Sequence, residues 1–178
     1  MCTVIILAAG KGERFLASGA TTHKLDALLH HKPVLEHVIE AVKAAGLPWH
    51  LVRPEGGTPG MGDSIALGVQ ATRHAAGWLI LPGDLPLIQP RSLQLVAAAL
   101  DEKTVVVPHY EGRHGHPVGF GQDYRDALCA LSGDSGAREI VRQARLAGKV
   151  QDLPLPDAGI IEDIDVLADL TKIARRVN

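Results

Sequence analysis

Short runs of apolar residues alternate along the chain with longer segments whose apolar positions recur every three or four residues. The first run is Val4 to Leu7, and similar runs occupy residues 49–52, 78–81, 104–107 and 118–120. A strand that is apolar on both faces is typical of a sheet covered on two sides. We therefore expect these runs to form a buried sheet in which Val4 to Leu7 is a central strand.

The longer segments predict helices. Residues 32–46 have Pro33 at an allowed first-turn position, Gly46 as a stop, and one apolar stripe made of Val34, Leu35, Val38, Ile39 and Val42. Further helices are expected in residues 62–77, capped by Asp63 or Ser64, in residues 89–100, with Pro90 in the first turn, and in residues 133–148 and 163–177. Strands alternating with helices predict an α/β fold, a three-layer sandwich with a mostly parallel sheet, in which ligands bind at the carboxyl ends of the strands.

Composition narrows the class of protein. A chain of 178 residues, 46% hydrophobic, fits one domain over residues 1–178. A formal charge of −2 gives no global attraction to nucleic acid or to anionic membranes, so we expect neither as a partner. Two cysteines without paired spacing, Cys2 and Cys129, argue against a disulfide framework and indicate the cytoplasm. The first apolar run lacks a basic leader and is far shorter than the ~20 residues of a membrane span.

The first predicted strand ends in a loop that is suited to phosphates. Residues 8–15 read AAGKGERF, and the small residues Ala8, Ala9, Gly10 and Gly12 would let backbone N–H groups approach a ligand closely. Positive charge comes from Lys11, Arg14 and, further on, Lys24. The combination favours a nucleoside triphosphate, and the alternative is a surface turn with solvated charges.

Two other nucleotide motifs can be compared with this loop. A dinucleotide fingerprint needs a third glycine where Phe15 stands, which makes a nicotinamide-linked oxidoreductase a remote alternative. A P-loop needs G-x-x-x-x-G-K-[ST], and the chain contains no such run.

The spacing L-A-A-G-x-G-x-R at Leu7 to Arg14 resembles the signature loop of the nucleotidyltransferases of molybdenum cofactor biosynthesis, whose fold is Rossmann-like and of the nucleotide-diphospho-sugar transferase type. Further stretches resemble the same family in the right order: KLDALLHHKPVLEHVIEAV, GMGDSIALGV, LPGDLPLI, HYEGRHGHPVGF, LSGDSGAR and IEDIDVLADL. The matches run from about residue 4 to residue 170, and such an ordered set is more specific than any one motif.

The resemblance implies a transfer of a nucleoside monophosphate from a nucleoside triphosphate to a phosphorylated acceptor, with pyrophosphate leaving. This chemistry needs positioning, charge neutralisation and Mg²⁺ more than a side-chain nucleophile. By resemblance, Arg14 and Lys24 face phosphate oxygens and Asp84 holds the metal. The second carboxylate is expected to be Asp165 rather than Asp163, although one of the two could instead cap the last helix. The nucleotide and acceptor contacts implied are Leu7, Ala8, Ala9, Gly10, Gly12, Gly62, Ser64 and His116.

Several of these residues have a simpler interpretation. Asp84 could cap a helix or turn, and GMGDS could be no more than a capped helix start. His114 and His116 could form a zinc site with His109, but no further ligand is clustered with them. The resemblance makes His116 a structural or acceptor-side contact, and Arg138 either an acceptor-phosphate contact or a surface ion.

The chain departs from the family pattern in three places. The segment FLASGATTH separates Arg14 from Lys24, where relatives have fewer residues. About 13 residues lie between the first long helix and Gly60, too few for a full crossover and two strands, so we expect a shortened sheet edge. The closing motif is D-I-D-V-L-A-D-L where the family has D-I-D-T-P-x-D-L, so a preset turn is lost and the carboxylates are kept.

The resemblance also bears on the substrates. Ala8 and Ala9 are similar to the loop of the cytidine enzymes, so CTP is favoured over GTP, and molybdopterin is the expected acceptor. A transient molybdoenzyme partner would fit that acceptor. The alternatives are a guanylyl- or sugar-phosphate nucleotidyltransferase, and a non-catalytic nucleotide-binding relative, because a fold does not fix a function.

Overall fold

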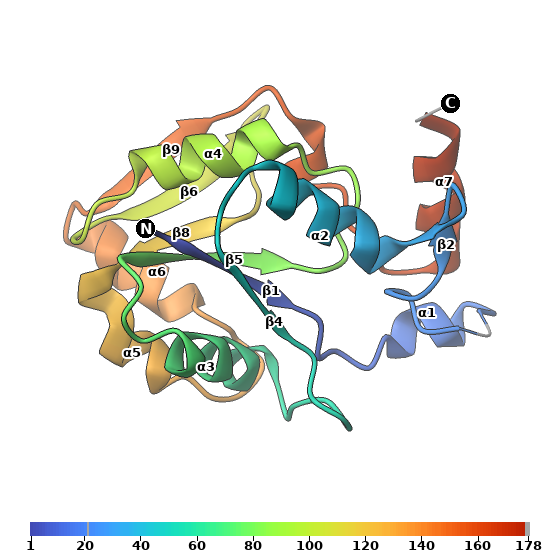
Figure 1. Ribbon diagram of the computed structural model, residues 1–178, viewed down its shortest axis with the longest axis horizontal. Helices are drawn as coiled ribbons and strands as arrows, with labels where there is room; N and C mark the ends of the chain where they lie inside the picture. The colour runs from blue at the N-terminus through green and yellow to red at the C-terminus, as the bar shows by residue number, and fades with distance from the viewer. Residues whose placement is uncertain (21, 177–178) are drawn as a thin grey trace.

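The computed structural model describes residues 1–20 and 22–176, without the side chain of Arg176. Within that part of the chain, the centre of the molecule is a seven-stranded sheet in the order β4-β1-β5-β8-β6-β7, with β9 paired to β6 (Figure 1). Its strands are β1 (Thr3–Leu7), β4 (Trp49–Val52), β5 (Gly77–Pro82), β6 (Val105–Tyr110), β7 (Arg113–His114), β8 (Val118–Gly121) and β9 (Val150–Pro154).

The sheet is mostly parallel. β1 pairs in parallel with β4 and β5, and β6 pairs in parallel with β9. β8 lies antiparallel between β5 and β6, which leaves β6 running in the same direction as β5. The carboxyl ends of β1, β4, β5, β6 and β9 therefore share one edge of the sheet, as the sequence predicts.

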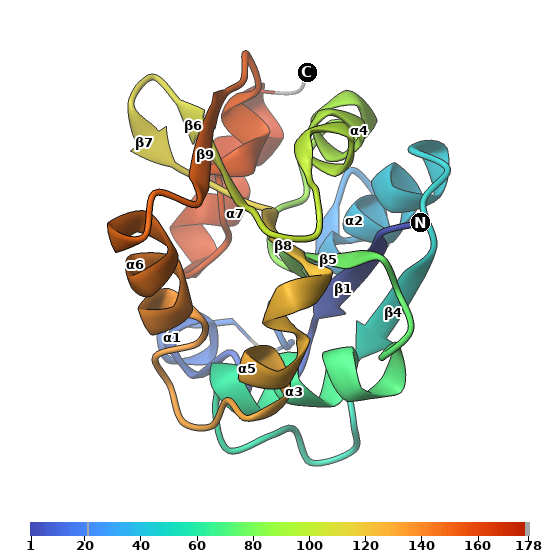
Figure 2. The same cartoon turned by 90° about the vertical axis from the view of Figure 1, so that its left-hand side faces the viewer.

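Helices cover both faces of the sheet. α2 (Val34–Ala44) and α4 (Pro90–Ala99) lie on one face, and α3 (Met61–Ala71), α5 (Arg125–Cys129) and α6 (Arg138–Leu146) lie on the other (Figures 1 and 2). The period-two alternation of a strand separates the cores: Val4 and Ile6 pack with α2 and α4, whereas Ile5 packs with α3. The predicted three-layer sandwich is confirmed.

The sheet ends at β4. No strand of the described residues lies beyond it, and a single loop leads from β4 into α3. The shortened edge expected from the sequence is therefore present. Gly68 packs tightly behind this edge, since a Cβ there would lie 2.4 Å from Cγ2 of Ile5.

Some local predictions are wrong. α3 begins at Met61 with Gly60 as its N-cap and no side-chain cap, so neither Asp63 nor Ser64 caps it. The chain enters the helix earlier than predicted, which leaves both residues in the first turn. The strand β9 was not predicted, because it lies at the sheet edge, most of its side chains are exposed, and it has no continuous apolar run.

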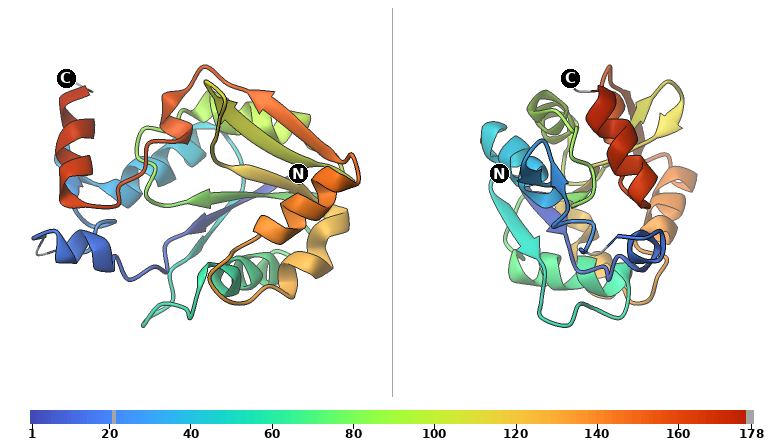
Figure 3. Two further views of the ribbon diagram at one scale, coloured as in Figure 1. Left: turned by 180° about the vertical axis from the view of Figure 1, so that it is seen from behind. Right: turned by 90° about the vertical axis from the view of Figure 1, so that its right-hand side faces the viewer.

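The short elements gather beyond the carboxyl ends of β1 and β5. These are α1 (Glu13–Ala17), the hairpin of β2 (Leu28–Leu29) and β3 (Lys32–Pro33), and the last helix α7 (Leu167–Arg176) (Figures 1 and 3). Two 3₁₀ turns cover Gln122–Tyr124 and Ala158–Ile160. No helix within the described residues has the length and apolar character needed to cross a membrane. The early helix α1 and the last helix α7 thus lie at the same edge of the sheet, where ligands are expected.

Candidate active site

A cavity of about 510 Å³ opens at the carboxyl ends of β1 and β5. Its walls come from the loop after β1, the segment before β2, the start of α3, the end of β5, and two aspartates from later in the chain. The lining residues are Leu7, Ala8, Ala9, Gly10, Lys11, Gly12, Glu13, Arg14, His23, Lys24, Leu25, Thr58, Pro59, Gly60, Met61, Ser64, Pro82, Gly83, Asp84, Asp134 and Asp165.

The loop after β1 is held in place by its neighbours on both sides. Ala8 N–H donates to the Val52 carbonyl oxygen over 2.9 Å. Gly57, with φ of +76°, packs so closely that a Cβ there would lie 2.8 Å from the Ala9 carbonyl oxygen. Gly12 has φ of +64°, a left-handed conformation that favours glycine, and it begins α1. The geometry of the loop therefore requires glycine at position 12, apart from any ligand, whereas a Cβ at Gly10 would meet nothing within 4 Å.

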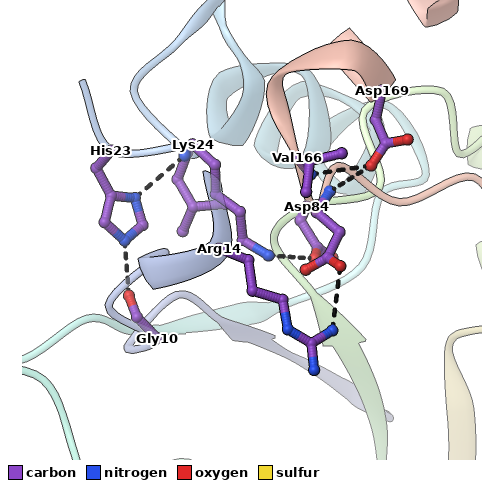
Figure 4. Close-up of polar contacts among 9 residues, drawn as sticks. Gly10, Arg14, His23, Lys24, Asp84, Val166 and Asp169 are labelled. Atoms are coloured by element: carbon purple, nitrogen blue, oxygen red, sulfur yellow. Dashed lines mark hydrogen bonds and ion pairs between the residues drawn. The ribbon is translucent and has the colours of Figure 1, made fainter. Parts of the chain in front are cut away.

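His23 anchors the extra segment between Arg14 and Lys24. Leu25 N–H donates to its Nδ1 over 3.2 Å, so Nε2 carries the hydrogen and donates to the Gly10 carbonyl oxygen over 2.7 Å (Figure 4). The same ring packs against Gly12, where a Cβ would lie 3.2 Å from Nε2. The insertion therefore closes back onto the glycine loop and delivers Lys24 to the cavity.

Lys24 forms an ion pair with Asp84. The distance from Nζ to Oδ2 is 2.8 Å, and the two side chains are only 19% and 16% exposed. Asp84 follows β5, and the preceding Gly83 is fixed by its N–H, which donates to the Leu7 carbonyl oxygen over 2.8 Å. Figure 4 shows Lys24 and Arg14 pointing toward the end of β5, where Asp84 lies. The pair is largely shielded from water, so removing either charge would leave the other partly buried and without compensation.

Two more aspartates are brought to Asp84 by one backbone hydrogen bond. Ile164 N–H donates to the Asp84 carbonyl oxygen over 3.0 Å, and the Ile164 side chain is fully buried. Of the flanking residues, Asp165 pairs with Arg14 at 3.2 Å in a solvent-exposed contact and lines the cavity. The pKa of Asp163 is raised, first by partial desolvation of its carboxyl and then by the negative charge of Asp84.

The chemistry of this donor set fits a divalent cation. Carboxylates of Asp84, Asp163 and Asp165 are close enough to interact electrostatically, and in the structure their charge is met by Lys24 and Arg14. Within the part of the chain described, no group of three or more His, Cys, Asp or Glu side chains is arranged to hold a metal. One or two carboxylates with substrate phosphates is, however, how Mg²⁺ is usually bound.

Sequence reasoning missed two residues that hold the segment bearing Asp165. The Asp169 carboxylate accepts hydrogen bonds from the N–H groups of Asp165 and Val166, over 2.9 and 3.0 Å. The Ser18 hydroxyl accepts one from Leu167 N–H over 2.9 Å. Asp169 thus satisfies the backbone ahead of α7, the task considered for Asp163 or Asp165. The spacing of Asp169, four residues after Asp165, could have indicated its capping role. The role of Ser18 could not be inferred from the sequence, because it lies 149 positions from Leu167.

Two of the predicted contacts, Gly62 and His116, do not line the cavity. Gly62 faces the loop before α6, since a Cβ there would lie 2.8 Å from the Ser132 carbonyl oxygen. His116 is fixed by its N–H, which donates to the Ile160 carbonyl oxygen over 3.0 Å, and its Nδ1 is buried without a hydrogen-bond partner among the described residues. Burial lowers the pKa of His116, against the opposing effect of the Asp84 charge.

The remaining candidates lie elsewhere. Arg138 is exposed at the first position of α6 and does not line the cavity. His109 and His114 contact each other edge to face, with ring centroids 4.5 Å apart, and His109 Nε2 lies 2.6 Å from the Asp152 carboxylate. These two histidines are therefore engaged in local contacts of β6, β7 and β9.

Comparisons with known proteins bear on the family of the chain. Residues 4–149 match the model of the MobA-like NTP transferase domain. The Bacillus subtilis purine catabolism protein PucB is 26% identical over 200 residues, covering 98% of this chain and 96% of PucB. The bifunctional protein GlmU of Syntrophomonas wolfei is 29% identical over 149 residues, covering 72% of this chain and 32% of GlmU. The chain thus corresponds to about a third of GlmU.

Solved structures resemble the whole fold. A nucleotidyl transferase from Methanothermobacter superposes with a TM-score of 0.82 at 22% identity, covering 100% of this chain and 99% of its own. Rv0371c of Mycobacterium tuberculosis, in complex with manganese, gives 0.75 at 20% identity, covering 98% of both chains. A CMP:2-keto-3-deoxy-manno-octonic acid synthetase complexed with CTP gives 0.64 at 15% identity, covering 99% of this chain and 98% of its own.

At these identities the structural neighbours establish the nucleotidyltransferase fold, and the family model, which covers most of the chain, establishes the family. The chain belongs to the MobA-like NTP transferase domain family, which confirms the enzyme class predicted from its motifs, a nucleotidyltransferase.

Proposed function

We propose that this protein, acting as a single domain over residues 1–178, transfers CMP from CTP to the phosphate of molybdopterin and releases pyrophosphate. An oxygen of the acceptor phosphate attacks the α-phosphorus of the nucleotide. The bond between that phosphorus and the oxygen that bridges the α- and β-phosphorus atoms breaks. The electron pair leaves with pyrophosphate. The observation that carries the proposal is the pairing of Lys24 and Arg14 with Asp84 and Asp165 beside the glycine loop.

These pairs suggest how the site accepts its substrate. In the ligand-free protein each cation is neutralised by a carboxylate. Asp84 and Asp165 would hold Mg²⁺, which when bound supplies positive charge to the phosphates. Lys24 and Arg14 would then turn from the carboxylates to phosphate oxygens, so that charge stays balanced within the cavity.

The preference for CTP rests on the loop and on the start of α3. Ala8 and Ala9 present only methyl groups, both buried. The hydroxyl groups of Thr58 and Ser64, which line the same cavity, are hydrogen-bonded to each other at the start of α3. This part of the cavity lining offers small polar groups of the kind that could meet a base and ribose. His116 is near enough to Asp84 to feel its charge and does not line the cavity, and we propose it as a structural or acceptor-side contact.

The remaining parts of the proposal concern the surroundings of the enzyme. Cys2 and Cys129 are free thiols, in keeping with the reducing cytoplasm as its compartment. A molybdoenzyme that takes up the finished cofactor would be its transient partner.

The test is to mix the protein with each nucleoside triphosphate, Mg²⁺ and molybdopterin and to measure pyrophosphate. We expect release with CTP, and a loss of at least about a hundredfold in Asp84→Asn, the scale of removing a charge-stabilising group. The two single variants Asp165→Asn and Asp163→Asn should be measured in parallel. The larger increase in the Mg²⁺ concentration needed for half-maximal rate identifies the second metal carboxylate, and we expect it for Asp165.

Other outcomes would redirect the proposal. Release with GTP, or with a sugar phosphate in place of molybdopterin, would make the protein a different member of the same enzyme class. The shortened sheet edge favours a second candidate, a nucleotide-binding protein without turnover. That candidate predicts heat of CTP binding in calorimetry and no pyrophosphate with any acceptor.

A further inference from the structure

The segment that carries Asp165 lies at the open side of the site. Ile164 anchors one end of it, because its side chain is fully buried and its N–H bonds to Asp84. After Ile164 the side chains become partly or fully exposed, and Leu167 is 36% exposed. The α7 helix is held to the core further on, by the buried Ile173. Between these two anchors the backbone depends on hydrogen bonds to keep the Asp165 carboxylate in place.

Ser18 supplies a bond across the site. Its hydroxyl donates to the Phe15 carbonyl oxygen over 2.7 Å and accepts from Leu167 N–H over 2.9 Å. Its own N–H donates to the Arg14 carbonyl oxygen over 3.1 Å. Because Phe15 is buried in the core, Ser18 ties the Asp165 segment to a fixed point on the turn that carries Arg14.

Two departures from the family pattern meet in this bond. Ser18 belongs to the segment FLASGATTH that separates Arg14 from Lys24. Leu167 stands where the motif implied by the resemblance, D-I-D-T-P-x-D-L, has proline, since residues 163–170 read D-I-D-V-L-A-D-L. A proline there has no N–H to donate and would preset the entry into the helix. In this chain the leucine restores the N–H, and the inserted serine accepts it.

We propose that Ser18 is a positioning residue for Asp165. Its hydroxyl accepts the Leu167 N–H and so fixes the entry into α7 that a proline at position 167 would otherwise preset. The inference rests on the proposed function, in which Arg14 leaves Asp165 for the nucleotide phosphates. The Arg14–Asp165 ion pair is then lost, whereas the bond from Leu167 N–H to the neutral Ser18 hydroxyl requires no charge and stays. Ser18 therefore holds the carboxylate at the metal position when the substrate is bound.

The test measures Mn²⁺ binding to the CTP-bound protein by calorimetry, and pyrophosphate release as a function of metal concentration. Ser18→Ala should weaken Mn²⁺ binding roughly two- to tenfold, the range for losing one hydrogen bond. CTP binding without metal should be unchanged. Ser18→Thr keeps the hydroxyl and should restore the affinity for Mn²⁺. Thr171→Ala, an exposed change on α7 outside the site, is the matched control and should have no effect.

A merely structural role for Ser18 is separated by two double variants. In Asp165→Asn, which lacks the carboxylate to be positioned, adding Ser18→Ala should not weaken Mn²⁺ binding further. In Leu167→Pro, which restores the proline of the motif and removes the N–H, Ser18→Ala should also have no added effect. Thermal unfolding of each variant shows whether it is folded. If Leu167→Pro does not fold, Ser18→Ala and Ser18→Thr are sufficient for the test.

Wild-type affinity in Ser18→Ala, or an equal loss in the Asp165→Asn background, would overturn the inference and leave the proposed function intact. Absence of pyrophosphate release and Mn²⁺ binding in the wild-type protein would instead defeat the proposed function. Weaker Mn²⁺ binding that Ser18→Thr restores, and that disappears in both double variants, would establish the positioning role.

Discussion

Lys24→Met tests whether the ammonium of Lys24 neutralises carboxylates at the position proposed for the metal. Methionine keeps an unbranched apolar side chain of similar length, so the change removes mainly the charge. In the native protein Nζ lies 2.8 Å from Asp84 Oδ2, and the two side chains are 19% and 16% exposed. Asp84 also interacts unfavourably with Asp163, whose pKa it helps to raise. Without Lys24, both carboxylates lose their nearest compensating charge.

The size of the effect follows from burial. Breaking a fully buried ion pair costs about 3–5 kcal/mol, and an exposed pair contributes only about 0–1 kcal/mol. For a pair that is mostly but not fully buried we expect a loss of about 2–4 kcal/mol in the free energy of unfolding. Lys32→Met is the matched control. Lys32 pairs with Glu40 at the surface, where the side chains are 39% and 49% exposed, so its loss should cost less than about 1 kcal/mol.

The assay is urea unfolding of Lys24→Met, Asp84→Asn and the double variant at pH 7. We expect a coupling of about 1–3 kcal/mol, with the double variant more stable than the sum of the single changes predicts. Millimolar Mg²⁺ should also raise the stability of Lys24→Met more than that of the wild type, since a bound cation stabilises the fold by mass action. Additive single changes, or a loss in Lys24→Met no larger than in Lys32→Met, would refute this account of the pair.

Three further predictions concern other parts of the structure. Gly57→Ala should raise the KM for CTP severalfold in steady-state assays, because a Cβ would lie 2.8 Å from the Ala9 carbonyl oxygen and displace the loop; an unchanged KM would contradict this. Burial lowers the pKa of His116, so the folded protein favours the neutral imidazole. The stability that this neutral side chain contributes is present above about pH 6.5 and is lost as pH falls below that value. Urea unfolding from pH 7.5 to 5.5 should therefore show a shallower acid loss in His116→Gln than in the wild type, and parallel curves would argue against it. Asp157→Ala should cost about 2–4 kcal/mol of unfolding free energy by the same assay, because this buried carboxylate accepts from the Ser92 hydroxyl over 2.7 Å and from two backbone N–H groups; a cost below about 1 kcal/mol would show those donors finding other partners.

The sequence was most informative where a residue's pattern and its environment coincide. Val4 to Leu7 are apolar on both faces, and they form a central strand of the sheet. Pro90 begins α4 as predicted, because a missing N–H is tolerated at a first helical position. The loop of small residues after β1 lines the candidate active site, as expected of a loop that directly follows a central strand.

Contacts between distant segments could not be derived in this way. Nothing in the motif EDIDVLADL reveals that Ile164 N–H donates to the Asp84 carbonyl oxygen. Likewise, the length of FLASGATTH gave no indication that His23 would fold back onto Gly10. These bonds depend on how α7 and the insertion pack, which local propensity does not determine.

If nucleotidyl transfer takes place at Asp84, the α-phosphate of the nucleotide moves to the acceptor, where a label on it can be followed. The protein is incubated with α-³²P-labelled CTP, Mg²⁺ and molybdopterin, and the acceptor is separated and counted. We expect one label in the acceptor for each pyrophosphate released, and almost none with Asp84→Asn. Pyrophosphate release that leaves the acceptor unlabelled, or transfer that persists undiminished in Asp84→Asn, would show that transfer does not take place at Asp84.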